Sequence, residues 1–190
     1  DQAENHAWFD VGRGVQKYMG PSRNDAEATS ALTLTAFGTN GFTVSTAGIT
    51  GYGSQTYIAY GWKVQGAAGA ANEDGSVNTT STSVNSTSKI SIGLYTGTGS
   101  AGMTVGHGLG VAPDFIVVKK RAAADRWCAY HSGNTSAPET EAIYLSETDA
   151  TADDADFWND VAPSSSLVTF GDKGDINAAV TTVMYCWKAV

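Results

Sequence analysis

The closing stretch of the chain, TVMYCWKAV at residues 182–190, decides the fold because its side chains alternate in character. Val183, Tyr185, Trp187 and Ala189 fall on one face of an extended strand, since successive strand residues point to opposite sides. Large apolar residues repeated on one face are typical of a strand that packs against the core of a β-sandwich. The sequence therefore predicts a core strand at the end of the chain.

Nearly the same strand occurs once before, as TYIAYGWKV at residues 56–64. Trp62 precedes Trp187 by 125 residues, and Trp8 precedes Trp127 by a similar distance, 119 residues. A period of this length indicates a repeated unit of domain size rather than one turn of a solenoid. The apolar face of the first copy is formed by Ile58, Tyr60, Trp62 and Val64.

The composition favours short strands over long helices. Only 16% of the residues are charged, glycine alone accounts for 22 residues, and small polar residues fill much of the remainder. Glycine and Asn/Asp turns separate further apolar runs at short intervals, which favours antiparallel pairing. We predict an all-β chain of antiparallel β-sandwich modules, with strands in ISIGLY, DFIVVKK, RWCAYH, EAIYL and SLVTF.

The repeat divides the chain into three parts. Residues 90–190 read as a nearly complete module, whereas residues 1–64 match only the C-terminal half of one. Residues 65–89, rich in Gly, Ala, Ser, Thr and Asn and without periodicity, are predicted to form a flexible linker. A half module exposes unpaired strand edges. We therefore expect either an upstream segment or a neighbouring subunit to complete residues 1–64.

Charge and motifs argue against several function classes. The net charge of −8 opposes binding to a nucleic acid backbone. No stretch approaches the roughly 18 apolar residues of a membrane span, so we expect no membrane insertion. GTGSAG at 97–102 has the spacing of a nucleotide-binding loop, but MTVGHGLGVAP after it cannot form the required helix. With no GxSxG or HExxH motif either, we expect no cofactor and no enzymatic activity.

Two polar features are candidates for metal binding. The acidic run ETDATADDADFWND could supply oxygen ligands to calcium, although its spacing fits no EF-hand and a solvated acidic loop explains it equally. The metal candidates in it are Asp149, Asp153, Asp154 and Asp156. His107, flanked by glycines, could be a ligand or a general base, but no partner is placed beside it, and we interpret it as part of a structural turn.

Aromatic residues in loops are candidates for sugar binding, because a ring stacks on the apolar face of a pyranose. Tyr52 and Tyr95 lie beside glycine-rich turns, and Trp158 has no counterpart in the repeat. The alternative is that these three rings are structural. The tryptophans that do recur are predicted to be core residues: Trp8, Trp62, Trp127 and Trp187.

Cys128 and Cys186 both belong to the second copy of the repeat, and the first copy has neither. This co-occurrence is compatible with a disulfide between them. Two unrelated buried thiols are the alternative.

Several strings resemble modules of tail fibre and other virion structural proteins of tailed bacteriophages. They are RGVQKY, NDAEATSALTLTAFGTNGFTV and TYIAYGWK in the first copy, and YTGTGSAGMTVGHGLGVAPDFIVVKKR, DRWCAYH and FWNDVAPSSSLVTFG in the second. The resemblance covers most of residues 8–190 in the same order of blocks, but GDKGDINAAVT lacks a glycine typical of the turn before the last strand. It supplies no catalytic residues.

This resemblance implies a structural protein in a tail fibre or surface appendage, outside the host cell. We expect it to assemble with copies of itself into a homo-oligomer or fibre and to contact other virion proteins. The alternative is an adhesin module that attaches the particle to a host surface glycan. The two hypotheses differ in what is exposed: assembly buries apolar strand edges, whereas adhesion presents aromatic loops.

Overall fold

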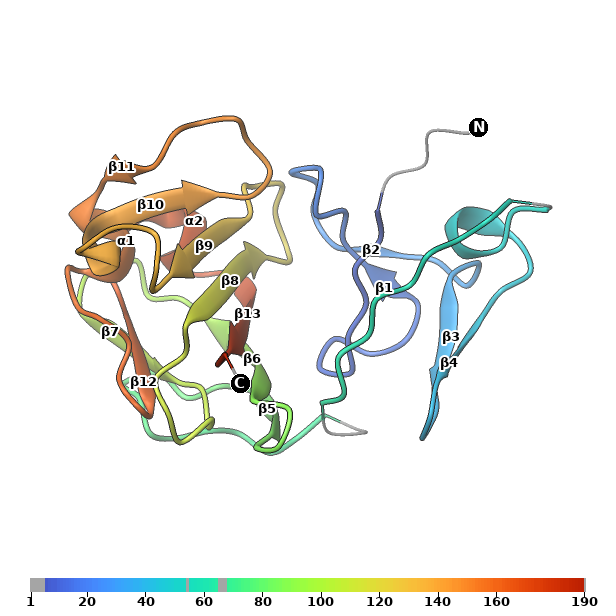
Figure 1. The fold of residues 1–190 in the computed structure, drawn as a ribbon, viewed down its shortest axis with the longest axis horizontal. Coiled ribbons are helices and arrows are strands. Elements are labelled where there is room, and N and C mark those ends of the chain that lie inside the picture. The colour runs from blue at the N-terminus through green and yellow to red at the C-terminus, as the bar shows by residue number, and fades with distance from the viewer. Residues whose placement is uncertain (1–5, 54, 65–67, 190) are drawn as a thin grey trace.

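Strand β13 (Thr181–Trp187) is the central strand of a computed structural model that describes residues 6–53, 55–64 and 68–189. It pairs with β6 (Ile90–Thr96) on one side and with β8 (Phe115–Lys120) on the other (Figure 1). The sheet has seven strands in the order β11-β10-β9-β8-β13-β6-β5, all antiparallel. Its other strands are β5 (Ser81–Asn85), β9 (Cys128–His131), β10 (Glu141–Tyr144) and β11 (Ala152–Asp153). The predicted all-β antiparallel class is confirmed.

Both faces of β13 are buried. Met184 and Cys186 contribute to one apolar cluster, on the first face of the sheet, and Val183 and Tyr185, which alternate with them along the strand, contribute to another on the second face. Sulfur-containing side chains pack well in a core, so the first face is as apolar as the second. The sheet is therefore the middle layer of the molecule, covered on two sides.

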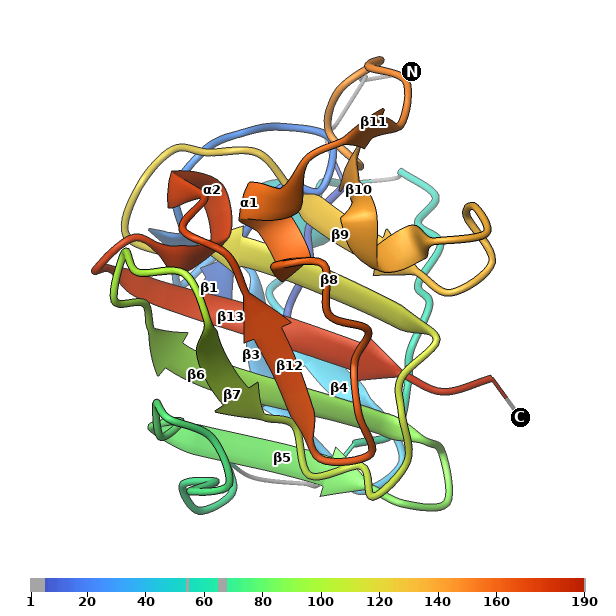
Figure 2. The ribbon, with the colours of Figure 1, turned by 90° about the vertical axis from the view of Figure 1, so that its left-hand side faces the viewer.

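A short ribbon and two helical turns cover the first face. Strands β7 (Met103–Gly106) and β12 (Leu167–Phe170) pair with each other and lie over the sheet (Figure 2). Helices α1 (Ala155–Trp158) and α2 (Gly174–Asn177) add side chains to the same core, which is the arrangement of a β-sandwich. None of the helices in the described ranges is long and apolar enough to cross a membrane.

The N-terminal segment covers the second face. Met19 is fully buried there together with Trp127 and Tyr185, and Trp8 packs against them. The indole Nε1 of Trp127 donates to the carbonyl oxygen of Gly20 at 3.0 Å. This segment contains the two-residue strands β1 (Lys17–Tyr18) and β2 (Ala28–Thr29), which pair with each other beside the sheet (Figure 1).

The rest of the first copy extends away from the sheet. Strands β3 (Leu34–Phe37) and β4 (Phe42–Val44) form a hairpin, followed by the 3-10 turn η1 (Gly48–Thr50), at the far side of the molecule in Figure 1. A second 3-10 turn, η2 (Pro138–Thr140), precedes β10.

The predicted linker at 65–89 is wrong for the residues that form β5. Residues 81–85 pair with β6, and Thr82 N donates to Ala70 O at 2.8 Å, so the preceding residues also follow the sheet edge. Serine and threonine are accepted at a half-buried sheet edge, and composition alone does not show that a partner strand follows. Residues 65–67 lie outside the described residues.

The predicted strand at 56–64 is also wrong, because these residues adopt no regular secondary structure. A strand needs a neighbour to accept its backbone hydrogen bonds. In the described part of the chain no backbone–backbone hydrogen bond involves residues 56–64. Three predicted core side chains are consequently exposed: Ile58, Tyr60 and Trp62.

Candidate functional site

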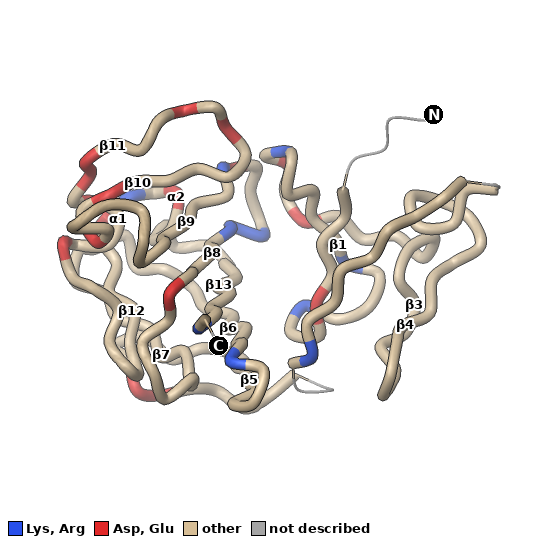
Figure 3. Tube along the Cα trace, viewed as in Figure 1, with Lys and Arg blue, Asp and Glu red and all other residues tan. Residues whose placement is uncertain are grey.

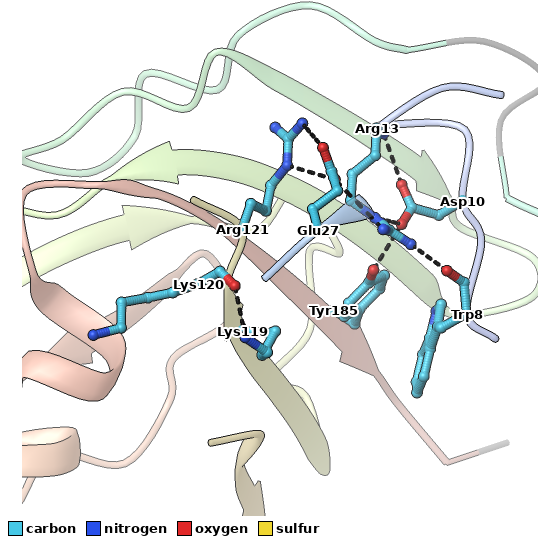
Figure 4. Close-up of polar contacts among 8 residues, drawn as sticks. All are labelled: Trp8, Asp10, Arg13, Glu27, Lys119, Lys120, Arg121 and Tyr185. Carbon is cyan, nitrogen blue, oxygen red and sulfur yellow. Dashed lines mark hydrogen bonds and ion pairs between the residues drawn. The ribbon is translucent and has the colours of Figure 1, made fainter. Parts of the chain in front are cut away.

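A largely buried network of charged groups and one tyrosine hydroxyl joins the N-terminal segment to the sheet (Figure 4). We call it the ion network; its members are Asp10, Arg13, Glu27, Arg121 and Tyr185. The ion network could not be predicted from the sequence, because its members lie far apart along the chain and share no motif. The only local signal is the spacing of Asp10 and Arg13, which lets the two residues meet within one turn.

Arg13 is at the centre of the ion network. Its Nε forms an ion pair with Asp10 Oδ2, its Nη2 donates to Trp8 O at 2.7 Å, and its Nη1 lies 3.5 Å from Glu27 Oε2. The Tyr185 hydroxyl of β13 donates to Asp10 Oδ2 at 2.6 Å. A buried arginine is tolerated when its donors are satisfied in this way.

Arg121 completes the ion network from the end of β8. Its Nε and Nη2 donate to the two oxygens of Glu27, each at 3.0 Å, and Glu27 N donates to the backbone oxygen of Arg121 at 2.9 Å. This bidentate geometry is the strong form of an arginine–carboxylate pair. Glu27 therefore bridges Arg13 of the N-terminal segment and Arg121 at the end of β8.

The ion network shifts the pKa values of its members. Burial alone would lower the pKa of Arg13, but Tyr185, Asp10 and Glu27 outweigh it, and the pKa lies above the ordinary value. Burial raises the pKa of Tyr185 well above its usual range, with Arg13 acting in the opposite direction. Both groups keep their protons at neutral pH, so Arg13 stays charged and Tyr185 stays a neutral hydrogen-bond donor.

Lys119 is a fully buried lysine near the ion network (Figure 4). Its Nζ donates to the backbone oxygens of Lys120 at 2.9 Å and Ala123 at 3.3 Å. Burial lowers its pKa to about 8, Lys120 adds to this effect, and Asp125 opposes it. The ammonium thus pairs with carbonyl dipoles instead of a carboxylate.

A second ion cluster anchors helix α2. Arg126 donates from Nε and Nη2 to the two oxygens of Asp175, at 3.2 and 3.1 Å, and stacks over the Tyr144 ring at 4.0 Å. Asp125 pairs with Lys120. Burial and the neighbouring Asp125 raise the pKa of Asp175, because two adjacent carboxyl groups resist ionising together.

The possible disulfide between Cys128 and Cys186 is not formed, and both cysteines are free and buried. Cys128 pairs with Val118 of β8 and Cys186 with Ile116 of the same strand, so β8 separates the two thiols. The alternative of two buried thiols describes the structure. Burial raises the pKa of Cys186 to about 12.

Two of the three predicted sugar-binding rings are core residues. Tyr95 is buried, and its hydroxyl donates to Ile176 O at 2.6 Å. Trp158 is buried as well, and its Nε1 donates to Glu141 O at 3.0 Å. For both residues the structural alternative holds, because the ring is buried and its polar atom donates to a backbone oxygen of another part of the chain. Tyr52 is exposed, as expected for a ring that could stack on a sugar.

The acidic candidates do not converge on a metal site. Within the described ranges no group of three or more His, Cys, Asp or Glu residues is placed to hold a metal ion. Asp154 caps helix α1 by accepting from Asp156 N at 3.1 Å, and pairs with Lys173 at 2.6 Å. Asp149 and Asp153 are exposed. The capping role explains part of the acidic run.

His107 has a structural role, as its interpretation as a turn residue predicts. The ring is buried, Nδ1 accepts from Leu109 N at 3.2 Å, and Nε2 lies 3.2 Å from Ser164 O. Burial lowers its pKa. The histidine therefore ties two loops together.

The surface feature that sequence reasoning missed is a stretch without charge. No charged residue occurs between Glu27 and Lys63, and we call residues 28–62 the uncharged segment. Figure 3 shows the β3–β4 hairpin free of acidic and basic positions. Most exposed large apolar residues among those described belong to the uncharged segment: Leu32, Phe42, Val44, Tyr52, Tyr57, Ile58, Tyr60 and Trp62. The gap in charge was readable from the sequence.

Residues 56–62 are the most open part of the uncharged segment. Ile58 and Tyr60 are 80% and 81% exposed. Among the described contacts, those that join this stretch to the sheet lie at its end and just after it: Trp62 meets Trp187 edge to face at 6.0 Å, and Asn85 Nδ2 donates to Lys63 O at 3.0 Å. The preceding residues run past the sheet as an extended coil (Figure 1).

Comparison with known proteins gives a family but no function. No curated protein and no solved structure matches the chain. A family model described as a domain of unknown function, DUF7483, matches residues 1–190. The match covers both copies of the repeat and the residues between them, and the chain therefore belongs to the DUF7483 family.

Proposed function

We propose that the chain is a structural protein of a bacteriophage virion, in a tail fibre or surface appendage, and that copies of it assemble through the uncharged segment. The observation that carries the proposal is the concentration of exposed apolar side chains in residues 28–62. Exposed apolar surface in a water-soluble fold marks sites of interaction. The assignment to a phage particle rests on the resemblance of the repeat to virion modules.

Charge supports self-association over binding to a charged partner. Each copy carries a net charge of −8, so copies repel one another wherever their charged surfaces meet. The uncharged segment is the part of the chain where this local repulsion is absent. The uncharged segment also offers no charged side chain with which a strongly charged partner could form an ion pair.

Light scattering over a wide range of protein concentration tests the assembly. We expect a mass that is a multiple of that of one chain, and dissociation when Phe42 is replaced by aspartate. Val161→Asp is the matched control, because Val161 is exposed but lies outside the uncharged segment. A chain that stays monomeric at every concentration would overturn the proposal. Detection of its peptides in purified particles of a phage that encodes the chain would test the virion location.

Tyr52 favours the second candidate function, an adhesin that binds a host surface glycan. Its ring is 56% exposed in a glycine-rich turn, where a sugar ring could stack on it. A glycan array tests this function directly. Binding that is lost in Tyr52→Ala and retained in Val161→Asp would favour the adhesin.

A further inference from the structure

Residues 56–62 resemble the central strand β13 in sequence. At the spacing of 125 residues, Thr56, Tyr60 and Trp62 are identical to their counterparts, and Ile58 matches Val183. β13 is hydrogen-bonded along both edges, to β6 and to β8. Residues 56–62 make no backbone–backbone hydrogen bond within the described chain. A sequence suited to the middle of a sheet is thus left with two open edges.

An open edge of this kind is a template for strand pairing between molecules. Most soluble proteins protect such edges with charged residues, yet residues 56–62 contain none, and apart from Lys63 directly after them the nearest preceding charged residue is Glu27. The contact of Trp62 with Trp187 holds one end of the stretch in place, which reduces the entropy lost when it pairs. Ile58 and Tyr60 remain free to contact a partner.

We propose that residues 56–62 form an intermolecular β-strand by pairing antiparallel with the same residues of a second copy, about a two-fold axis at Ala59. This inference rests on the proposed self-assembly and names its contact. Every strand pair in the described sheets is antiparallel, and self-pairing of identical strands in that direction gives a closed two-fold interface. Because the strand is uncharged, pairing it with its own copy brings no like charges together.

The register follows from the side chains. With the axis at Ala59, Ile58 of each copy lies opposite Tyr60 of the other. The two most exposed side chains therefore cover each other in two equivalent pairs. On the other face, Gly61 lies opposite Tyr57 and leaves room for its ring; a Cβ added at Gly61 meets nothing within 4 Å. An axis at Tyr60 would place Ile58 against Trp62, which already packs on Trp187.

Cysteine cross-linking of the full chain tests this register. In Ala59→Cys the two new thiols face each other across the axis, at a separation that a disulfide can close. In Gly61→Cys, the matched control, they are offset by four residues, about 13 Å along the strand. Under mild oxidation we expect covalent dimers to form roughly tenfold faster for Ala59→Cys than for Gly61→Cys. The parent chain, whose own thiols are buried, should give none.

The outcomes separate the pairing from the proposed function. Equal cross-linking of the two variants, or faster cross-linking of Gly61→Cys, in a chain that associates by light scattering would overturn the register and leave self-assembly standing. A parent chain that is monomeric in light scattering, together with no cross-link in either variant, would overturn both. Loss of association in Ile58→Asp but not in Val161→Asp would support the pairing, and unchanged association in Ile58→Asp would contradict it.

Discussion

Arg13 is held by groups from two distant parts of the chain. Asp10 and Trp8 come from its own segment, whereas Tyr185 belongs to the central strand and acts on it through Asp10. Breaking one side of a buried ion pair costs more than the pair contributes, because the remaining charge loses its partner in a place that water does not reach. The residue therefore fixes where the N-terminal segment sits.

Arg13→Met should lower the free energy of unfolding by about 3 kcal/mol, since Asp10 and Glu27 lose a buried cationic partner. Urea denaturation measures the change. Arg23→Met is the control, because the Arg23–Asp25 pair is exposed and its loss should cost under about 1 kcal/mol. Equal losses in the two variants would mean that the ion network contributes no more than a surface pair.

Lys119 gives stability a characteristic dependence on pH. Its pKa is about 8 in the folded chain against an ordinary value of 10.5, so between these values the unfolded chain binds more protons. Stability must then rise with pH across this window. Relative to Lys119→Met, the parent should gain on the order of 1 kcal/mol between pH 8 and 9 in urea denaturation. Parallel pH profiles would show that the lysine is solvated.

At the scale of the element, two sequences with the same aromatic alternation have different structures. Residues 181–187 form a strand because β6 and β8 lie on either side of them, whereas residues 56–62 have no backbone–backbone hydrogen-bond partner among the described residues. Strand preference describes fitness for a sheet that already exists. The alternation of side chains shows that each copy suits a β-sheet, but it does not show whether a neighbouring strand is present.

Most strands of the sheet could be predicted from the sequence, whereas one edge strand and the long-range contacts could not. The strands β6, β8, β9, β10, β12 and β13 were readable as apolar runs between turns. β5 was not, because its Ser/Thr sequence matches that of a linker. Tyr95 and Trp158 look like loop residues beside glycine or acidic turns, and only the folded chain shows the backbone oxygens that their polar atoms reach. The ion network depends on contacts between distant residues, which no local pattern contains.

Hydrogen exchange distinguishes the two kinds of segment. Backbone amides of β5 should be protected, because this strand is paired with β6, whereas those of residues 56–62 should exchange near the unfolded rate in dilute solution. Mass spectrometry of peptides covering each range measures the difference. Slow exchange at 56–62 in a chain shown to be monomeric would mean that its amides are already satisfied.

At the scale of the whole molecule, the N-terminal segment is a layer of the core. It covers Val117, Trp127 and Tyr185 on the second face of the sheet. The sequence predicts a nearly complete module at 90–190, but in the structure that range lacks both this cover and the edge strand β5. Apolar surface that loses its cover is exposed to water and promotes aggregation.

Residues 90–190 expressed alone should therefore be less stable than the full chain and should bind a dye for exposed apolar surface. Thermal unfolding and dye fluorescence of the two chains, measured side by side, test this. Restoring residues 68–89 should recover β5 but leave the second face uncovered. A monomeric 90–190 fragment that melts at the same temperature as the full chain would show that the cover is dispensable.

The stacked rings of Trp8 and Trp127 give the docking of the N-terminal segment a spectroscopic signature. The ring centroids are 5.3 Å apart and the planes are inclined by 24°. Two indoles this close share their electronic excitation, which produces a paired positive and negative band in circular dichroism. Because one indole belongs to the N-terminal cover and the other to the sheet, that band should vanish as soon as the cover lifts, even while the strands remain intact.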